Sequence, residues 1–202
     1  AGTLLVIRQN FTEKDTLTRT VNILKNVNAN ILGYILNAID YKKFSYRYGH
    51  YSSKYGGKYY NNYTYLQSTE DIRISEKEGN TENGITLVVK ENCRNIINEA
   101  FRVVRTNVDF MLGKGKSHKV VMFTSLNPGS GKSFVSANLA YCMSLKKKKV
   151  VAVDLDLRRA SLSQVVDRPH HGVVDYLNGD RKSWRDVLVH VEDSSFDVIP
   201  VG

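Results

Sequence analysis

A glycine-rich hexapeptide, residues 128–133, is the segment of this sequence best suited to chemistry. It reads Pro-Gly-Ser-Gly-Lys-Ser and lies directly between a strand-like run and a helix-like run. Glycines let backbone N–H groups turn toward phosphate oxygens, and the following helix aims its positive end at them. The Lys132 ammonium can reach the β- and γ-phosphates of a nucleotide, and the Ser133 hydroxyl can bind Mg²⁺.

We therefore predict that this loop binds a nucleotide, with a structural glycine turn as the alternative. Leu126 stands where the usual Walker pattern has its first glycine, so the match to that pattern is incomplete. The predicted nucleotide-binding residues are Pro128, Gly129, Ser130, Gly131, Lys132, Ser133 and Phe134.

Two carboxylates, Asp154 and Asp156, follow a second buried strand-like run at residues 150–153. They share one side if the strand continues through them, at the edge of a sheet where ligands of open α/β folds bind. We interpret Lys132 and the two aspartates as catalytic residues, with Ser133 and Asp156 at the metal. Asp154 would accept a hydroxyl proton or support the metal. The alternative is that both aspartates only cap a loop.

Residues 41–65 are rich in tyrosine, set among Gly, Ser, Asn and Lys without an acidic residue. Such low-complexity sequence cannot build a core, yet it leaves each hydroxyl accessible to an active site. Phosphorylation of four tyrosines would add roughly −6 to −8 of charge and reverse the local positive charge. A tyrosine-stacking surface for nucleic acid or glycan is the competing interpretation. The candidate phosphoacceptors are Tyr41, Tyr46, Tyr48, Tyr51, Tyr55, Tyr59, Tyr60, Tyr63 and Tyr65.

Hydrophobic periodicity predicts the elements that must position these groups. The first strand, helix and strand should form a parallel, right-handed unit. Both halves of the sequence should contribute to one doubly wound, mainly parallel sheet of an α/β fold. Strands are expected at residues 3–8, 30–39, 119–124, 149–154 and 196–201, helices at 17–27, 92–112 and 133–145, and a linker-like polar stretch at 75–84.

Composition restricts the class of protein. With 202 residues, 42% of them hydrophobic, the chain is long enough for one α/β domain with a tail. Its apolar runs fall short of the roughly 20 residues that cross a bilayer, and no signal sequence opens it, so we expect a cytosolic chain. The net charge of +9 is compatible with binding to nucleic acid. However, the run of four lysines at 146–149 is better explained as the solvated end of a helix. We expect Cys93 and Cys142 to be buried free thiols.

Three motifs together resemble the bacterial tyrosine kinases, a family of P-loop autokinases. They are Glu-x-x-Arg-x-x-Arg at residues 99–105, the loop at 128–133 and Asp-Leu-Asp-Leu-Arg-Arg at 154–159. Residues 172–179 and 197–202 also look like that family's continuation, so the resemblance covers 86–202 and, with the tyrosine cluster, 1–65. It implies a P-loop NTPase-like doubly wound sheet with a flexible tyrosine-rich segment.

The resemblance further implies an ATP- and Mg²⁺-dependent protein-tyrosine autokinase that regulates capsule or exopolysaccharide synthesis and export. Subunits of a ring would phosphorylate one another's tyrosine clusters, and Glu99, Arg102 and Arg105 would hold the ring together. A purely intrahelical i,i+3 salt-bridge ladder is the alternative for these three residues.

The implied partners are a membrane polysaccharide co-polymerase with its activator segment and a phosphotyrosine phosphatase, at the inner face of the plasma membrane. The implied division of the chain is a C-terminal-type βαβ part at 1–40, the tyrosine cluster at 41–65, a linker at 66–90 and the nucleotide-binding part at 91–202.

The sequence departs from the family in two ways. The tyrosine-bearing part precedes the nucleotide-binding part, an apparently permuted order. Family members carry a helix and the Walker B strand between segments like 198–202 and 1–6, and neither element is found here. A missing central strand leaves buried backbone groups without hydrogen bonds, which is costly. Another chain would therefore fill this position, or the sheet would be re-ordered. A non-catalytic nucleotide-binding regulatory module of a co-polymerase is therefore the alternative function. A DNA-binding partition-type ATPase is a third, which leaves the tyrosines unexplained.

Overall fold

The computed structural model describes residues 1–38, 85–113, 119–192 and 194–202, which form two compact units. The first unit contains residues 1–38, 108–113 and 119–132 of this described part. The second contains the remainder. Helices α4 (Ile96–Met111) and α5 (Lys132–Ser144) each have residues in both units. The tyrosine cluster and the polar stretch at 75–84 lie outside the described residues.

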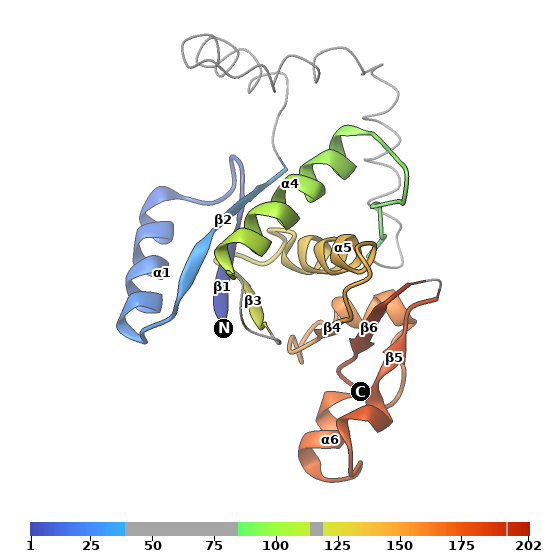
Figure 1. The fold of residues 1–202 in the computed structure, drawn as a ribbon. Helices are drawn as coiled ribbons and strands as arrows, with labels where there is room; N and C mark the ends of the chain where they lie inside the picture. The colour runs from blue at the N-terminus through green and yellow to red at the C-terminus, as the bar shows by residue number, and fades with distance from the viewer. Residues whose placement is uncertain (39–84, 114–118, 193) are drawn as a thin grey trace. The chain divides into compact units, whose positions relative to one another are not determined.

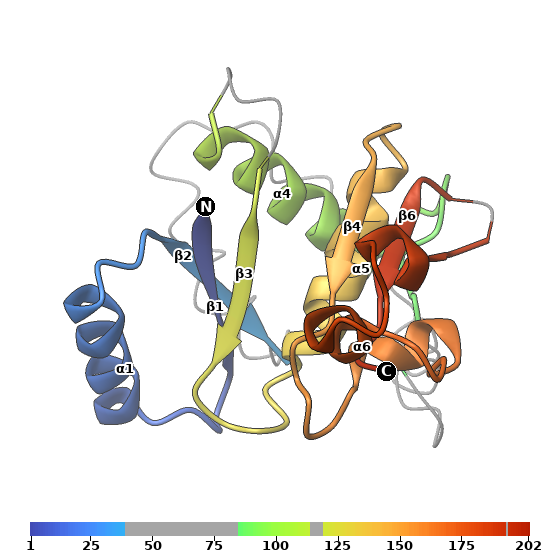
Figure 2. The same cartoon turned by 90° about the horizontal axis from the view of Figure 1, so that it is seen from below.

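The first unit is built on a parallel sheet with the strand order β2-β1-β3 (Figure 1, Figure 2). Its central strand β1 carries a continuous apolar run whose side chains Leu5 and Val6 are fully buried, as expected for a parallel strand covered on both faces. The predicted parallel strand-helix-strand unit is confirmed. Strand β3 from the second half of the sequence joins this sheet as predicted, whereas β4 and β6, which were expected in the same sheet, belong to a second one. The elements are β1 (Gly2–Arg8), α1 (Lys14–Asn26), β2 (Ile31–Asn37) and β3 (Val121–Ser125).

The second unit has a three-stranded sheet in the order β4-β6-β5. Strands β4 (Val150–Val153) and β6 (Phe196–Ile199) are parallel, as predicted. The short strand β5 (Val189–His190) runs antiparallel to β6 and was not predicted. A strand of two residues has no periodicity for sequence analysis to detect.

Helices cover both faces of the β4-β6-β5 sheet. Phe196 and Val198 of β6 pack against Ala140 of α5, and Figure 2 shows α5 beside β4 and β6. Ile199 packs with residues of the helix α6 (Val173–Asn178) and the 3₁₀ helix η2 (Trp184–Val187). Successive side chains of a strand point to opposite faces, so α5 and α6 lie on opposite sides of this sheet. The remaining element is the 3₁₀ helix η1 (Leu162–Val166).

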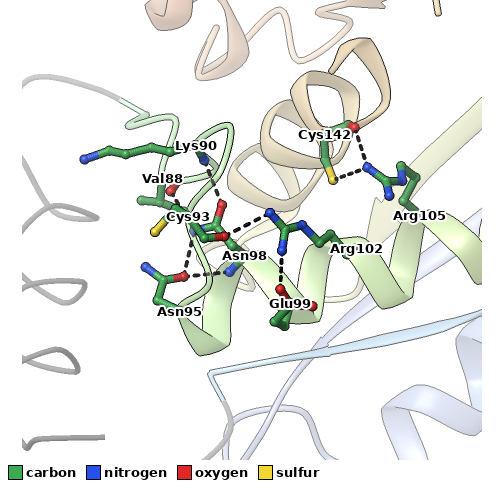
Figure 3. Close-up of polar contacts among 9 residues, drawn as sticks. All are labelled: Val88, Lys90, Cys93, Asn95, Asn98, Glu99, Arg102, Arg105 and Cys142. Atoms are coloured by element: carbon green, nitrogen blue, oxygen red, sulfur yellow. Dashed lines mark hydrogen bonds and ion pairs between the residues drawn. The ribbon is translucent and has the colours of Figure 1, made fainter. Parts of the chain in front are cut away.

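Two buried asparagines hold the segment at residues 86–90 against the helices of the second unit. Asn138 of α5 is 0% exposed; its Oδ1 accepts the N–H groups of Val88 and Val89 at 2.7 and 3.2 Å, and its Nδ2 donates to the Thr86 carbonyl at 3.1 Å. Asn98 of α4 is 1% exposed and accepts the Lys90 N–H at 2.8 Å (Figure 3). The side-chain amides of Asn138 and Asn98 thus form hydrogen bonds with backbone groups of residues 86–90 that have no partner in a sheet.

Helix α4 begins at Ile96 and not at the predicted residue 92, because Asn95 caps it. The Asn95 Oδ1 accepts the Asn98 N–H at 2.8 Å, which satisfies one of the free N–H groups of the first turn. Asn92 has a left-handed backbone with a φ of 61°, so the helix cannot extend back through it. No helix in the described part of the chain is both long and apolar enough to span a bilayer.

Replacing Asn138 by alanine should lower the free energy of unfolding by roughly 2–4 kcal/mol, because three backbone groups lose their buried partner. Urea denaturation would measure the loss. The control is Asn107→Ala, which removes an exposed asparagine of α4 and should change the stability by about 0.5 kcal/mol or less. Equal effects of the two substitutions would contradict the clamping role of Asn138.

Candidate functional site

The predicted phosphate-binding loop connects the end of β3 at Ser125 to the start of α5 at Lys132. Gly129 and Gly131 have φ angles of 76° and 86°, a left-handed conformation that glycine adopts without strain. Ser130 between them is 1% exposed, and its hydroxyl donates to the Asn127 carbonyl at 2.8 Å. The loop is therefore folded onto itself and leads directly into a helix.

Two side chains from other strands of the first unit donate hydrogen bonds to backbone carbonyls of this loop. Arg8 is the last residue of β1, and its Nη1 donates to the Gly129 carbonyl at 3.0 Å. Asn37 is the last residue of β2, and its Nδ2 donates to the Ser130 carbonyl at 3.0 Å. Sequence analysis missed both residues, because contacts between residues this far apart leave no local signal.

The loop residues fit a nucleotide phosphate. Left-handed glycines on either side of Ser130 form the kind of backbone concavity that binds anions, and α5 presents its N-terminal end at Lys132. The described residues contain no group of three or more His, Cys, Asp or Glu that could hold a metal ion. The predicted Mg²⁺ donors, the Ser133 hydroxyl and the Asp156 carboxylate beside phosphate oxygens and water, stay a prediction.

The two predicted carboxylates differ in their surroundings. Strand β4 ends at Val153, so the condition for Asp154 and Asp156 to share one strand face is not met. Asp154 is 3% exposed and accepts the N–H and the hydroxyl of Ser163, both at 2.8 Å, and the Asp156 N–H at 3.1 Å. Asp154 therefore organises the turn that presents Asp156, whose own Oδ1 accepts the Arg159 N–H at 3.3 Å.

The three charged residues predicted for an oligomer interface all make contacts within the second unit (Figure 3). Arg102 forms an i,i+3 ion pair with Glu99, and its Nη2 donates to the Cys93 carbonyl at 2.9 Å. Arg105 donates through Nη1 to the carbonyl of Cys142 at 3.1 Å and to its sulfur at 3.5 Å. The two arginines thus tie α4 to the preceding segment and to α5.

The structure distributes the predicted site residues over both units. Pro128, Gly129, Ser130, Gly131 and Lys132 lie in the first unit, and Ser133, Phe134, Glu99, Arg102, Arg105, Asp154 and Asp156 lie in the second. Phe134 packs edge-on against Phe101 of α4, with ring centroids 6.1 Å apart. The nine candidate tyrosines are outside the described residues.

Replacing Gly131 by alanine should weaken the binding of Mg-ATP at least tenfold. An alanine methyl group there would overlap the Nδ2 of Asn37, and the left-handed backbone adds strain of about 1–3 kcal/mol. Isothermal titration calorimetry would measure the affinity. Gly179→Ala is the matched control, because Gly179 has the same φ of 86° but open space around the added methyl. Equal affinities of the two variants would contradict the steric role of Gly131.

The Cys142 thiol should react slowly with Ellman's reagent at pH 8. Burial raises its pKa, and this effect outweighs the opposing influence of the Arg105 guanidinium. Because the pKa is raised, the reactive thiolate forms only at higher pH than in a free cysteine. Cys93→Ser isolates this thiol and Cys142→Ser isolates the half-buried Cys93, so the two variants compare the rates. Faster reaction of Cys142 would contradict the expectation. Cys142 is a buried free thiol as predicted, whereas Cys93 is only half-buried, which corrects the prediction for that residue.

Comparisons with known proteins agree with this geometry. Residues 121–192 match the family model described as the CobQ/CobB/MinD/ParA nucleotide binding domain. The chain is 31% identical over 130 residues to the tyrosine-protein kinase etk of Escherichia coli (strain K12), an alignment that covers 64% of this chain and 18% of the kinase. It is 28% identical over 119 residues to the succinoglycan biosynthesis transport protein ExoP of Rhizobium meliloti (strain 1021), covering 58% of this chain and 15% of that protein.

The chain is also similar to a solved kinase-domain structure. The kinase domain of Escherichia coli tyrosine kinase ETK superposes with a TM-score of 0.53 at 30% sequence identity, covering 66% of this chain and 52% of that domain. The chain spans less than a fifth of the length of the two curated relatives. This likeness and the loop at residues 128–133 support one conclusion: the chain has a P-loop α/β fold similar to that of bacterial tyrosine-kinase domains.

Proposed function

We propose that this chain is an ATP-dependent protein-tyrosine autokinase module that regulates capsule or exopolysaccharide synthesis and export. The observation that carries the proposal is the folded loop between β3 and α5, with left-handed Gly129 and Gly131 and with Lys132 at the start of the helix. The tyrosine-rich residues 41–65 supply acceptors in the same chain. The names of two relatives, a tyrosine kinase and a succinoglycan transport protein, support the kinase class and the polysaccharide context.

Each site residue has a role in this proposal. The loop amides and Lys132 hold the phosphates, and Ser133 and Asp156 hold Mg²⁺. The metal, when bound, supplies positive charge that neutralises the phosphate oxygens. Asp154 supports the metal through Asp156, because its carboxylate accepts the Asp156 N–H at 3.1 Å and is fixed by Ser163.

In the transfer step, a tyrosine oxygen forms a bond to the γ-phosphorus while the bond to the bridging oxygen of ADP breaks. The phenolic proton leaves to a carboxylate of the pair Asp154 and Asp156. Positioning and charge stabilisation account for most of the rate in such transfers, so loss of one carboxylate should lower the rate more than the binding.

The acceptor tyrosines would belong to a neighbouring subunit of a ring held in part by Glu99, Arg102 and Arg105. These residues already contact one another or backbone carbonyls, so an interface would add contacts to an ordered helix face. Phosphorylation would turn the basic cluster of residues 41–65 negative and replace attraction between subunits with repulsion. A membrane polysaccharide co-polymerase at the inner face of the membrane and a phosphotyrosine phosphatase would complete the system.

A non-catalytic, nucleotide-dependent regulatory module is the second candidate. The Asp154 carboxylate accepts three hydrogen bonds within its own unit. A carboxylate so engaged is poorly placed to accept a proton. Nucleotide binding without phosphotyrosine would distinguish this candidate from the kinase.

Intact mass spectrometry of the dephosphorylated chain after incubation with Mg-ATP tests the proposal. The parent should gain mass in steps of one phosphate each, located by peptide mapping in residues 41–65. Lys132→Met should gain none, because it lacks the ammonium that holds the β- and γ-phosphates. If ATP binds and no phosphate is transferred, the kinase proposal is wrong and the regulatory candidate stands.

A further inference from the structure

Two side chains outside the phosphate-binding loop fix the direction of its N–H groups. Arg8 donates to the Gly129 carbonyl and Asn37 donates to the Ser130 carbonyl, each at 3.0 Å. Both residues are the last of their strands, so the carboxyl ends of β1 and β2 meet consecutive peptide groups of one loop. The contacts join residues 121 and 93 positions apart in the sequence.

The geometry of the peptide bond converts these contacts into an orientation. In a planar trans peptide, the carbonyl of one residue and the N–H of the next point in opposite directions. A donor that holds the Gly129 carbonyl therefore turns the Ser130 N–H away from Arg8. Asn37 turns the Gly131 N–H away from itself in the same manner.

The two N–H groups are available for a ligand. Among the described residues, neither the Ser130 N–H nor the Gly131 N–H donates a hydrogen bond to another protein group. Ser130 is nearly fully buried, and a buried N–H without an acceptor is unfavourable. An anion on the inner side of the loop would satisfy both groups at once.

We propose that Arg8 and Asn37 are positioning residues that preorganise the loop to bind the β-phosphate of a nucleoside di- or triphosphate. They act through the loop backbone and do not touch the nucleotide. The first forty residues would thereby control the affinity of a loop that lies in the other half of the sequence. This inference rests on the proposed nucleotide binding and adds the residues that set its strength.

A second observation supports the role of Asn37. Its Nδ2 occupies the place where a side chain at residue 131 would lie, so Gly131 and Asn37 fit together closely. The amide therefore packs against the loop backbone as well as donating to it. Arg8 is held in place too, since its guanidinium lies 5.4 Å from the centre of the Phe11 ring.

Calorimetric titration of the full chain with Mg-ATP and with Mg-ADP tests the inference. Asn37→Ala should raise both dissociation constants by about three- to tenfold, the range expected for one lost hydrogen bond. ATP and ADP should lose affinity equally, because both carry the β-phosphate. The matched control is Asn30→Ala, immediately before the start of β2, where the asparagine Nδ2 donates to the Ala1 carbonyl at 3.1 Å. This control should bind both nucleotides as the parent does.

Arg8 provides an independent test if Asn37→Ala folds poorly. Arg8→Ala should weaken both nucleotides, and Arg8→Lys should restore most of the affinity because lysine keeps a charged donor. In the double variant Arg8→Ala/Asn37→Ala the losses should not add, since both side chains hold adjacent peptides. Urea unfolding of the nucleotide-free variants separates loss of affinity from loss of stability.

The outcomes distinguish the two proposals. If the parent binds neither nucleotide, the proposed function fails and the inference fails with it. If the parent binds and Asn37→Ala and Arg8→Ala stay within twofold of it, only the positioning role is overturned. A loss for ATP alone would also overturn it, because that pattern points to the γ-phosphate.

Discussion

The parallel pairing of β1 with β3 is the interaction on which the first unit depends. It places Val6 opposite Ser125, the last residue before the phosphate-binding loop. The carboxyl ends of β1 and β2 consequently lie where the loop begins, as the geometry of parallel sheets requires. Without this pairing neither Arg8 nor Asn37 could reach the loop carbonyls.

Side chains that bind backbone groups stabilise both units. In the first unit, Arg8 and Asn37 hold loop carbonyls. In the second, Asn138 binds three backbone groups of residues 86–89, and Asp154 fixes Ser163, whose hydroxyl in turn accepts the Val201 N–H at 3.0 Å. The buried contacts of the second unit specify one conformation, because each broken hydrogen bond leaves a polar group without a partner. The segments that carry the candidate site are thus ordered by single polar residues as well as by apolar packing.

Much of the fold could be predicted from the sequence, because strands and helices with clear periodicity have local signals. The loop at 128–133 and the strands around it were found within one or two residues. Helix α4 begins later than predicted because Asn95 caps it. The two-residue strand β5 was not predicted. The roles of Asn98, Asn138, Arg8 and Asn37 could not be predicted, since each depends on which distant backbone group folds against it. The place of Asp154 after a buried strand predicts a chemical role, and only the structure reveals its bonds to Ser163.

The β1–β3 pairing also has a consequence for how the protein is made. A ribosome completes β1 and β2 long before it synthesises β3. One edge of the central strand β1 therefore remains unpaired until β3 has been made. Contacts between such distant residues slow folding, although the entropic cost of closing the intervening chain rises only by about 0.6 kcal/mol for each doubling of its length. One edge of β1 should therefore stay unprotected until β3 has been synthesised, and this exposed edge is a natural site for a chaperone to bind.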